Sequence, residues 1–274
     1  MLVPSKLERL QGLLRELPAV VVAYSGGADS AFLADVAHEV LGEHALAVTA
    51  ISPSLAPEER DAAARLARER GWHHREVFTH ELESDDYARN APDRCYHCKT
   101  ELFSTLATLV AGHDVAVLVG TNLDDRSDFR PGQRAATERE IRAPLLEAGL
   151  TKDEIRALSR ERGLSTWDKP ASACLASRIA YGVEVTSERL NRVARAESFL
   201  RSLGIGEIRV RDHGELARIE VAAGDVERLA SDDVRRRVSA FLRELGFKYV
   251  TLDLEGFRSG SMNEVLLSIG RREV

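Results

Sequence analysis

The chain lacks the features that would point to a membrane, secreted or nucleic-acid-binding protein. No apolar run approaches the ~20 residues of a membrane span, and residues Met1 to Leu17 carry charges where a signal peptide needs an apolar stretch. There is no basic excess, because 38 Lys and Arg stand against 44 Asp and Glu, a formal net charge of −6. This balance argues against a general affinity for nucleic acid, although a local basic pocket is compatible with it. We therefore expect a cytoplasmic protein with no membrane partner.

Cysteine is also scarce, with three in 274 residues, and no low-complexity tract suggests disorder. Because cytoplasmic thiols stay reduced, we interpret the three cysteines as ligands or reactive groups rather than as a disulfide framework. A hydrophobic fraction of 44% and a charged fraction of 30% are typical of a globular protein. The length exceeds the roughly 100 to 200 residues of one domain, so we expect two domains.

Apolar runs that alternate with amphipathic segments indicate an α/β fold with a doubly wound parallel sheet in the N-terminal part. Ser5 with Glu8 fits a capping box for an opening helix, and Thr151 with Glu154 fits another. The other expected elements are strand 20–24, helix 31–41, strand 45–51, helix 57–70, strand 75–78 and strand 115–119.

Beyond Tyr181-Gly182 the order of elements changes to helix, strand, strand, helix, strand, which suits a smaller α+β domain. We therefore place the domain boundary at residue 182, which gives domains 1–182 and 183–274. The expected elements of the second domain are helix 187–203, strand 207–210, strand 217–221, helix 226–245 and strand 249–252.

The segment Ser25-Gly26-Gly27-Ala28-Asp29-Ser30 follows a continuous apolar strand and precedes a helix. Glycines allow the backbone to approach a ligand closely, and the N–H groups at a helix start favour an anion such as phosphate. Ser25 and Ser30 add hydroxyl donors, and Asp29 is placed to hold Mg²⁺ or to fix the loop. The loop lacks the lysine of a Walker motif, so it is not that of an ordinary kinase or GTPase. A plain glycine turn is the alternative.

A second polar segment, Gly120-Thr121-Asn122-Leu123-Asp124-Asp125, follows the strand 115–119. Because the carboxyl ends of parallel strands meet at one edge of a sheet, we expect this segment beside the first loop. Gly120 and Thr121 are candidates to line a nucleotide, and Asp124 or Asp125 to bind a metal ion. A solvated acidic turn is the other interpretation of the two aspartates.

Cys95-Tyr96-His97-Cys98 has the two-residue spacing that lets two thiolates reach one metal centre. Cys174 lies in a second motif, Lys169 to Arg178. Three thiolates are one fewer than a 4Fe-4S cluster usually has, so one iron would stay open to a non-protein ligand such as sulfide. The alternatives are a structural zinc site with His97, a redox dithiol, and unrelated buried cysteines.

The hexapeptide of the first loop resembles the signature of the PP-loop ATP pyrophosphatases, which include NAD and GMP synthetases and tRNA thiolases. With the cysteine motifs added, the chain closely resembles the ATP-dependent sulfur transferases of the LarE family, which help to make the nickel-pincer nucleotide cofactor of lactate racemase. The other segments that carry this resemblance are Arg94 to Lys99, Gly120-Thr121-Asn122, Lys169 to Arg178, Tyr181-Gly182 and Arg209-Val210-Arg211.

The resemblance implies that ATP adenylates a carboxylate of pyridinium-3,5-biscarboxylic acid mononucleotide and that sulfur then displaces AMP. In some family members the cysteine that matches Cys174 gives up its own sulfur. This chain departs from that type because it also has Cys95 and Cys98. It resembles the branch whose three cysteines hold a 4Fe-4S cluster with a transferable sulfide, so sulfide or another sulfur donor is expected as a partner. Family likeness also suggests a homo-oligomer.

Four further residues are candidates for the substrate site. Arg209 and Arg211 alternate onto one face of a strand, where paired hydrogen bonds would grip the substrate's phosphate; an exposed charged sheet face is the alternative. Ser177 and Arg178 are close enough to Cys174 in sequence to orient the acyl-adenylate, unless they lie on the surface.

Three other functions compete with sulfur transfer to the pyridinium substrate. A tRNA thiolase shares the PP-loop and three cysteines, but the acidic balance disfavours it. An amide-forming synthetase would not need the cysteines. A nucleotide or metal sensor would not turn over ATP.

Overall fold

The computed structural model describes residues 3–127, 131–170, 173–258 and 260–263. The chain divides into two compact units, each with its own sheet. The first unit comprises Met1–Glu81 and Cys95–Ser172, and the second comprises Leu82–Arg94 and Ala173–Val274. The boundary expected at residue 182 therefore falls inside the second unit, which also takes in a short segment from the N-terminal half of the chain.

The first unit is built on a four-stranded parallel sheet, as the sequence predicted. The strand order is β3-β2-β1-β4, so the chain changes direction across the sheet between β1 and β4. In such sheets ligands bind at the carboxyl ends of the strands, at this switch point. The strands are β1 (Val20–Ala23), β2 (Ala45–Ile51), β3 (His74–Phe78) and β4 (Ala116–Leu118).

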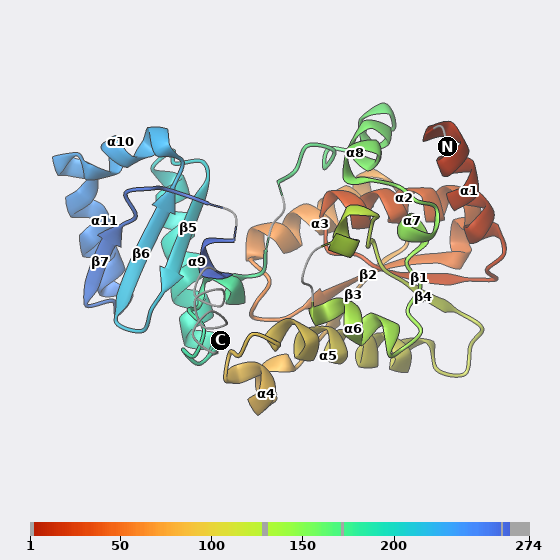
Figure 1. The fold of residues 1–274 in the computed structure, drawn as a ribbon, viewed down its shortest axis with the longest axis horizontal. Coiled ribbons are helices and arrows are strands. Elements are labelled where there is room, and N and C mark those ends of the chain that lie inside the picture. Colours follow the sequence, from red (N-terminus) through yellow and green to blue (C-terminus); the bar gives the residue numbers. More distant parts are fainter. Residues whose placement is uncertain (1–2, 128–130, 171–172, 259, 264–274) are drawn as a thin grey trace, which may run out of the picture. The chain divides into compact units, whose positions relative to one another are not determined.

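Helices cover both faces of this sheet (Figure 1). Val20 and Val22 of β1 face a core shared with α1, α2, α3, α7 and α8, whereas Val21 faces α5 and α6. Burial on both faces explains why this strand is apolar at every position. The helices are α1 (Val3–Arg15), α2 (Ala28–Leu41), α3 (Pro57–Glu69), α5 (Arg94–Val110), α6 (Pro131–Thr137), α7 (Pro144–Glu147) and α8 (Lys152–Glu161).

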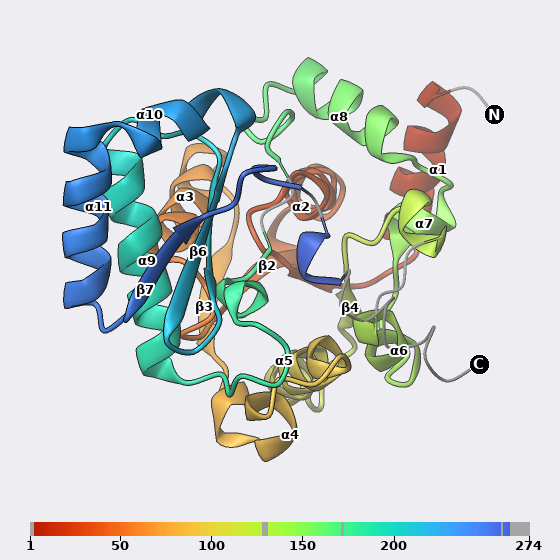
Figure 2. The same cartoon turned by 60° about the vertical axis from the view of Figure 1, so that its left-hand side comes forward.

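The second unit has a three-stranded mixed sheet of order β5-β6-β7, in which β5 runs antiparallel to β6 and β7 runs parallel to it. Figure 2 shows α9 and α11 against this sheet, and Leu200 and Leu242 of these helices are buried with Val210 and Ile219. This arrangement is the predicted smaller α+β domain. Its elements are α4 (Asp85–Ala88), α9 (Ser187–Ser202), β5 (Ile208–Asp212), β6 (Leu216–Val221), α10 (Val226–Ala230), α11 (Asp232–Glu244) and β7 (Tyr249–Leu252).

Two local predictions are wrong. α1 already begins at Val3, so Ser5 lies inside its first turn rather than at the N-cap; a proline at position 4 suits a first turn, where an N–H has no intrahelical partner. The expected helix 226–245 is interrupted at Ser231, which is extended with ψ 148 and precedes α11. The capping box of Thr151 and Glu154 is confirmed. Within the described ranges, no helix is long and apolar enough to cross a membrane.

Candidate active site

Residues 25–30 connect the end of β1 to the start of α2. Gly26 has φ +73, and a Cβ there would meet the Cβ of Ala63 at 2.9 Å, so the turn requires glycine. Gly27 is the N-cap of α2, with no side-chain capping bond, and the one described atom that a Cβ there would meet is the Ser25 hydroxyl, at 3.5 Å. The packing of the described residues therefore requires Gly26 but not Gly27, where the start of α2 carries no side chain.

The two serines of this loop have different surroundings. The buried Ser30 hydroxyl accepts a hydrogen bond from the Ser25 N–H at 3.2 Å and donates one to the Gly27 carbonyl at 3.2 Å. The Ser25 hydroxyl lies 3.1 Å from that of Ser30, and Ser25 is exposed. Ser30 therefore holds the loop in shape, whereas Ser25 is the more exposed of the two serines.

Gly120, just beyond β4, lies against the backbone of the same loop. A Cβ on Gly120 would come within 2.9 Å of the Ser30 nitrogen and 3.1 Å of the Asp29 carbonyl carbon. The side-chain amide of Asn122 donates to Asp29 Oδ1 at 3.3 Å, and Thr121 lies between these two positions, partly exposed. The structure thus brings together the two segments that were expected to meet at the carboxyl edge of the sheet.

The two aspartates that follow have different partners. Asp125 is buried and accepts a hydrogen bond from the Asn122 N–H at 3.0 Å, which stabilises the turn. Asp124 is exposed and accepts a hydrogen bond from the Lys152 N–H at 2.7 Å. Among the described residues, no group of three or more His, Cys, Asp or Glu side chains is arranged to hold a metal ion. A cation at this edge would therefore need further oxygen ligands, such as those of a phosphate.

Two lysines reach the glycine loop from distant parts of the sequence. Lys152, the first residue of α8, forms an ion pair with Asp29, with 2.5 Å between Nζ and Oδ2. Lys169 donates to the Gly26 carbonyl at 2.9 Å and pairs with Glu59 at 2.6 Å. The sequence reasoning missed both contacts. Lys169 is the first residue of the Cys174 motif. The only sign in the sequence that Lys152 belongs to the site is its place directly after the helix-capping Thr151.

Cys95 and Cys98 lie in the first turns of α5. Residues three apart share one face of a helix, so the two thiols are able to reach a common metal centre. Cys95 is exposed and Cys98 is partly buried. Cys174 is exposed and is the N-cap of the short 3₁₀ helix Leu175–Arg178; residues 171 and 172 of its motif lie outside the described residues. Because Cys174 belongs to the second unit, the convergence of all three cysteines stays a prediction.

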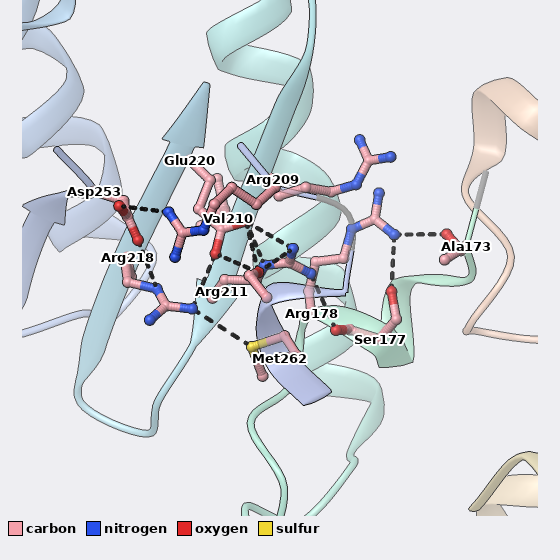
Figure 3. Close-up of polar contacts among 12 residues, drawn as sticks. Ala173, Ser177, Arg178, Arg209, Val210, Arg211, Arg218, Glu220, Asp253 and Met262 are labelled. Atoms are coloured by element: carbon pink, nitrogen blue, oxygen red, sulfur yellow. Dashed lines mark hydrogen bonds and ion pairs between the residues drawn. The ribbon is translucent and has the colours of Figure 1, made fainter. Parts of the chain in front are cut away.

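Arg178 holds the turn that begins at Cys174. Its Nη1 donates to the Ala173 carbonyl at 2.6 Å and to the Ser177 hydroxyl at 3.0 Å (Figure 3). It also donates to the Cys174 carbonyl at 3.2 Å. Its Nε pairs with the buried Glu197 at 2.9 Å, and the Arg178 side chain is only 4% exposed. This geometry favours a role in positioning Cys174 over the direct contact with substrate that the sequence suggested.

Arg94, the residue directly before Cys95, is anchored on the same turn. Its Nη1 donates to the Ala176 carbonyl at 2.9 Å and also to Asn90 Oδ1. Arg94 is buried, yet within the described part of the chain its hydrogen-bond acceptors are neutral oxygens. A buried guanidinium without a carboxylate is costly, so this position favours a nearby anion.

Arg209 and Arg211 share the face of β5 opposite the core residue Val210, as strand alternation predicts. Arg211 is buried, and its Nε and Nη2 donate to Glu220 Oε2 at 3.0 and 2.7 Å. Arg209 has no ion pair with any described residue, and its guanidinium lies 5.0 Å from the ring centroid of Phe257. Burial, followed by the positive charge of Arg178, lowers the pKa of Arg209. Figure 3 shows these side chains together; of the four arginines labelled there, Arg209 is the one with no ion pair to a described carboxylate.

No protein-family model matches this chain. The sequences of three similar proteins align with nearly its whole length. An uncharacterised protein of Synechocystis sp. is 46% identical over 96% of this chain and 98% of its own length, and one of Methanocaldococcus jannaschii is 30% identical over 93% and 98%. The pyridinium-3,5-bisthiocarboxylic acid mononucleotide synthase of Lactiplantibacillus plantarum is 40% identical over 96% of this chain and 95% of its own length. The chain belongs to the family of this synthase, the LarE family.

Proposed function

We propose that this chain is an ATP-dependent sulfur transferase that converts a carboxylate of pyridinium-3,5-biscarboxylic acid mononucleotide to a thiocarboxylate, a step in making the nickel-pincer nucleotide cofactor of lactate racemase. The name of the Lactiplantibacillus plantarum relative supports this substrate class. The observation that carries the proposal is the glycine at the start of α2, where the Gly27 N-cap has no side chain although the packing of the described residues does not require glycine there. Use of ATP and of reduced thiols agrees with a cytoplasmic location.

The glycine loop would hold the phosphates of ATP. The N–H groups at the start of α2 favour an anion, and Lys152 beside Asp29 supplies a positive charge that the loop itself lacks. Mg²⁺ prefers one or two carboxylates together with phosphate oxygens, which fits Asp29 and the exposed Asp124 better than the buried Asp125. When bound, Mg²⁺ would neutralise charge on the phosphates.

Adenylation makes a poor electrophile reactive. A carboxylate oxygen of the substrate attacks the α-phosphorus of ATP, the bond from that phosphorus to the bridging oxygen breaks, and pyrophosphate leaves with the electron pair. Attack by sulfur on the acyl carbon then expels AMP, which keeps the oxygen that came from the carboxylate. Positive charge and N–H donors around the loop stabilise the negative charge that develops on pyrophosphate.

Cys95, Cys98 and Cys174 would be the ligands of a 4Fe-4S cluster, which would supply a sulfide nucleophile. The shared helix face of Cys95 and Cys98 supports this assignment, and the buried positive charge of Arg94 would stabilise anionic sulfur next to it. A zinc site with His97 fits less well, because residues one or two apart on a helix point in different directions.

The arginines of the second unit would hold the substrate and the sulfur donor in place. Arg209, with no carboxylate partner among the described residues, is the better candidate to bind the phosphate of the mononucleotide, whereas Arg211 is held by Glu220. Arg178 and Ser177 would fix the backbone of the Cys174 turn.

The proposal is tested by the products. Anaerobically purified protein is given ATP, Mg²⁺, a sulfide source and the pyridinium substrate, and AMP, pyrophosphate and thiocarboxylate are measured. Wild-type protein should form AMP and pyrophosphate in equal amounts only when the substrate is present. Asp29→Asn should keep the fold, checked by circular dichroism, and lose AMP formation. Turnover by Asp29→Asn at the wild-type rate would show that Asp29 has no part in the mechanism. Thiolation of bulk tRNA instead of the pyridinium substrate would show that the protein is a tRNA thiolase.

A further inference from the structure

Lys152 has a fixed backbone, and its side chain ends on a single partner among the described residues. The capping box at the start of α8 fixes its position, Lys6 of α1 pairs with Glu154 of that box at 2.7 Å, and the Lys152 N–H donates to Asp124 at 2.7 Å. By contrast, the Lys152 and Asp29 side chains are 27% and 23% exposed. The ammonium group is therefore held in place by one partly exposed ion pair.

Both oxygens of Asp29 are engaged. Oδ2 accepts from Lys152 Nζ, and Oδ1 accepts from the Asn122 side-chain amide. A divalent cation and an ammonium group repel each other and compete for the same carboxylate lone pairs. A cation therefore binds Asp29 more weakly while Lys152 is paired with Oδ2.

The other lysine at the loop has a different environment. Lys169 binds both the Gly26 carbonyl and the Glu59 carboxylate, so it ties the loop to α3. Moving Lys169 would break both contacts and disturb the loop. Lys152 is the lysine that is able to change partners without disturbing the backbone of the loop.

We propose that Lys152 exchanges partners when the nucleotide enters, moving from Asp29 to the phosphates and leaving Asp29 free to bind a divalent cation. This inference rests on the proposed function, because it assigns Lys152 to the same nucleotide site. A partly exposed ion pair contributes little stability, so the exchange has a low energetic cost. Lysine binds phosphate as a compact point charge, and at this place it would neutralise the charge that the leaving pyrophosphate acquires.

Two binding measurements test the exchange without turnover. Mn²⁺ binding is followed by electron paramagnetic resonance in the absence of nucleotide, and ATP binding is followed by calorimetry in the presence of a chelator. Lys152→Met should bind Mn²⁺ about tenfold more tightly, because the competing charge is gone, and ATP about tenfold more weakly, because a charge-assisted hydrogen bond is lost. Lys152→Arg, which keeps the charge, should bind Mn²⁺ as weakly as the wild-type protein.

Lys6→Met is the matched control, because it removes a lysine that contacts the same helix through Glu154 but leaves Asp29 untouched. It should change neither affinity. The proposal is overturned if Lys152→Met leaves both affinities at the wild-type values, or shifts them only as much as Lys6→Met does. The two affinities are measured without the product assay. If the wild-type protein formed no AMP, that result would contradict the proposed function but not the exchange of partners by Lys152.

Discussion

Gly120 and Ser30 are packed backbone against backbone. A side chain at position 120 would place its Cβ 2.9 Å from the Ser30 nitrogen and 3.1 Å from the Ser30 Cα. Backbone atoms cannot rotate away as the end of a side chain can, so this contact fixes the segment after β4 against the start of α2. The residue at position 120 therefore controls the shape of the proposed phosphate site.

Gly120→Ala should push the loop out of position. We expect an overpacking cost of about 1–3 kcal/mol in the free energy of unfolding and a loss of ATP affinity measured by calorimetry. Gly12→Ala in α1 is the control, because no atom of the described residues lies within 4 Å of a Cβ there; it should stabilise the helix by up to about 1 kcal/mol and leave ATP binding unchanged. Wild-type ATP affinity in Gly120→Ala would contradict the proposed position of the phosphates.

Cys174→Ala should separate the two halves of the reaction. AMP formation should continue, because the glycine loop does not involve Cys174, whereas thiocarboxylate should no longer be detected by mass spectrometry. Retained sulfur transfer would exclude both a cluster held by Cys174 and the sacrifice of its sulfur.

Anaerobically purified protein should show iron-sulfur absorption with stoichiometric iron and sulfide. Cys95→Ser and Cys98→Ser should each lose it, because each removes one of three proposed ligands. Stoichiometric zinc in place of iron would favour a structural metal site.

The two arginines of β5 should respond differently to replacement. Arg209→Met should weaken binding of the pyridinium mononucleotide with little change in the free energy of unfolding, because Arg209 has no ion pair among the described residues. Arg211→Met should lower that free energy by roughly 3 kcal/mol, since the buried Glu220 would keep only Arg218 as an ion-pair partner within the described ranges. Urea unfolding and substrate titration of both variants distinguish the roles; equal loss of stability would show that Arg209 is structural.

His38 should make the first unit less stable in mild acid. Its Nδ1 lies 2.8 Å from the Ala34 carbonyl, which only accepts, so Nδ1 carries the proton and Nε2 accepts from the His73 N–H at 3.0 Å. Burial lowers the pKa of His38. The unfolded chain therefore binds this proton at higher pH than the folded chain does. Stability should be full above the ordinary histidine value of about 6.5 and should fall as the pH drops from there towards the folded pKa.

His38→Gln tests this origin of the acid sensitivity. Urea unfolding at about pH 7.5 and about pH 5.5 should show a smaller loss of stability in the variant than in the wild-type protein. Some loss should remain, because burial also lowers the pKa of His74. An identical loss in both proteins would mean that His38 does not contribute.

The sequence predicted those parts of the fold that depend on local patterns. The apolar run of β1, the glycine loop and the Thr151 capping box were all visible because each depends on neighbouring residues. The break at Ser231 was also visible in principle, since a serine followed by two aspartates is a common helix start. Its neighbours continue the helical pattern on both sides, which concealed the break.

The charge pairs of the site could not be predicted in the same way. Lys152 and Asp29 are separated by 123 residues, so only the fold brings them together. Strand register places Arg209 opposite Glu220, but Glu220 bonds to the diagonal neighbour Arg211 instead. Which of several arginines on one face of the sheet binds a given carboxylate depends on packing that no sequence pattern encodes.

The central claim is that ATP activates the substrate carboxylate as an acyl-adenylate before sulfur arrives. It is tested most directly with pyridinium substrate whose carboxylates carry isotopically heavy oxygen, followed by mass spectrometry of AMP and pyrophosphate. Our account predicts one heavy oxygen in AMP for each thiocarboxylate formed and none in pyrophosphate. Thiocarboxylate formed together with unlabelled AMP, or label in pyrophosphate, would contradict it.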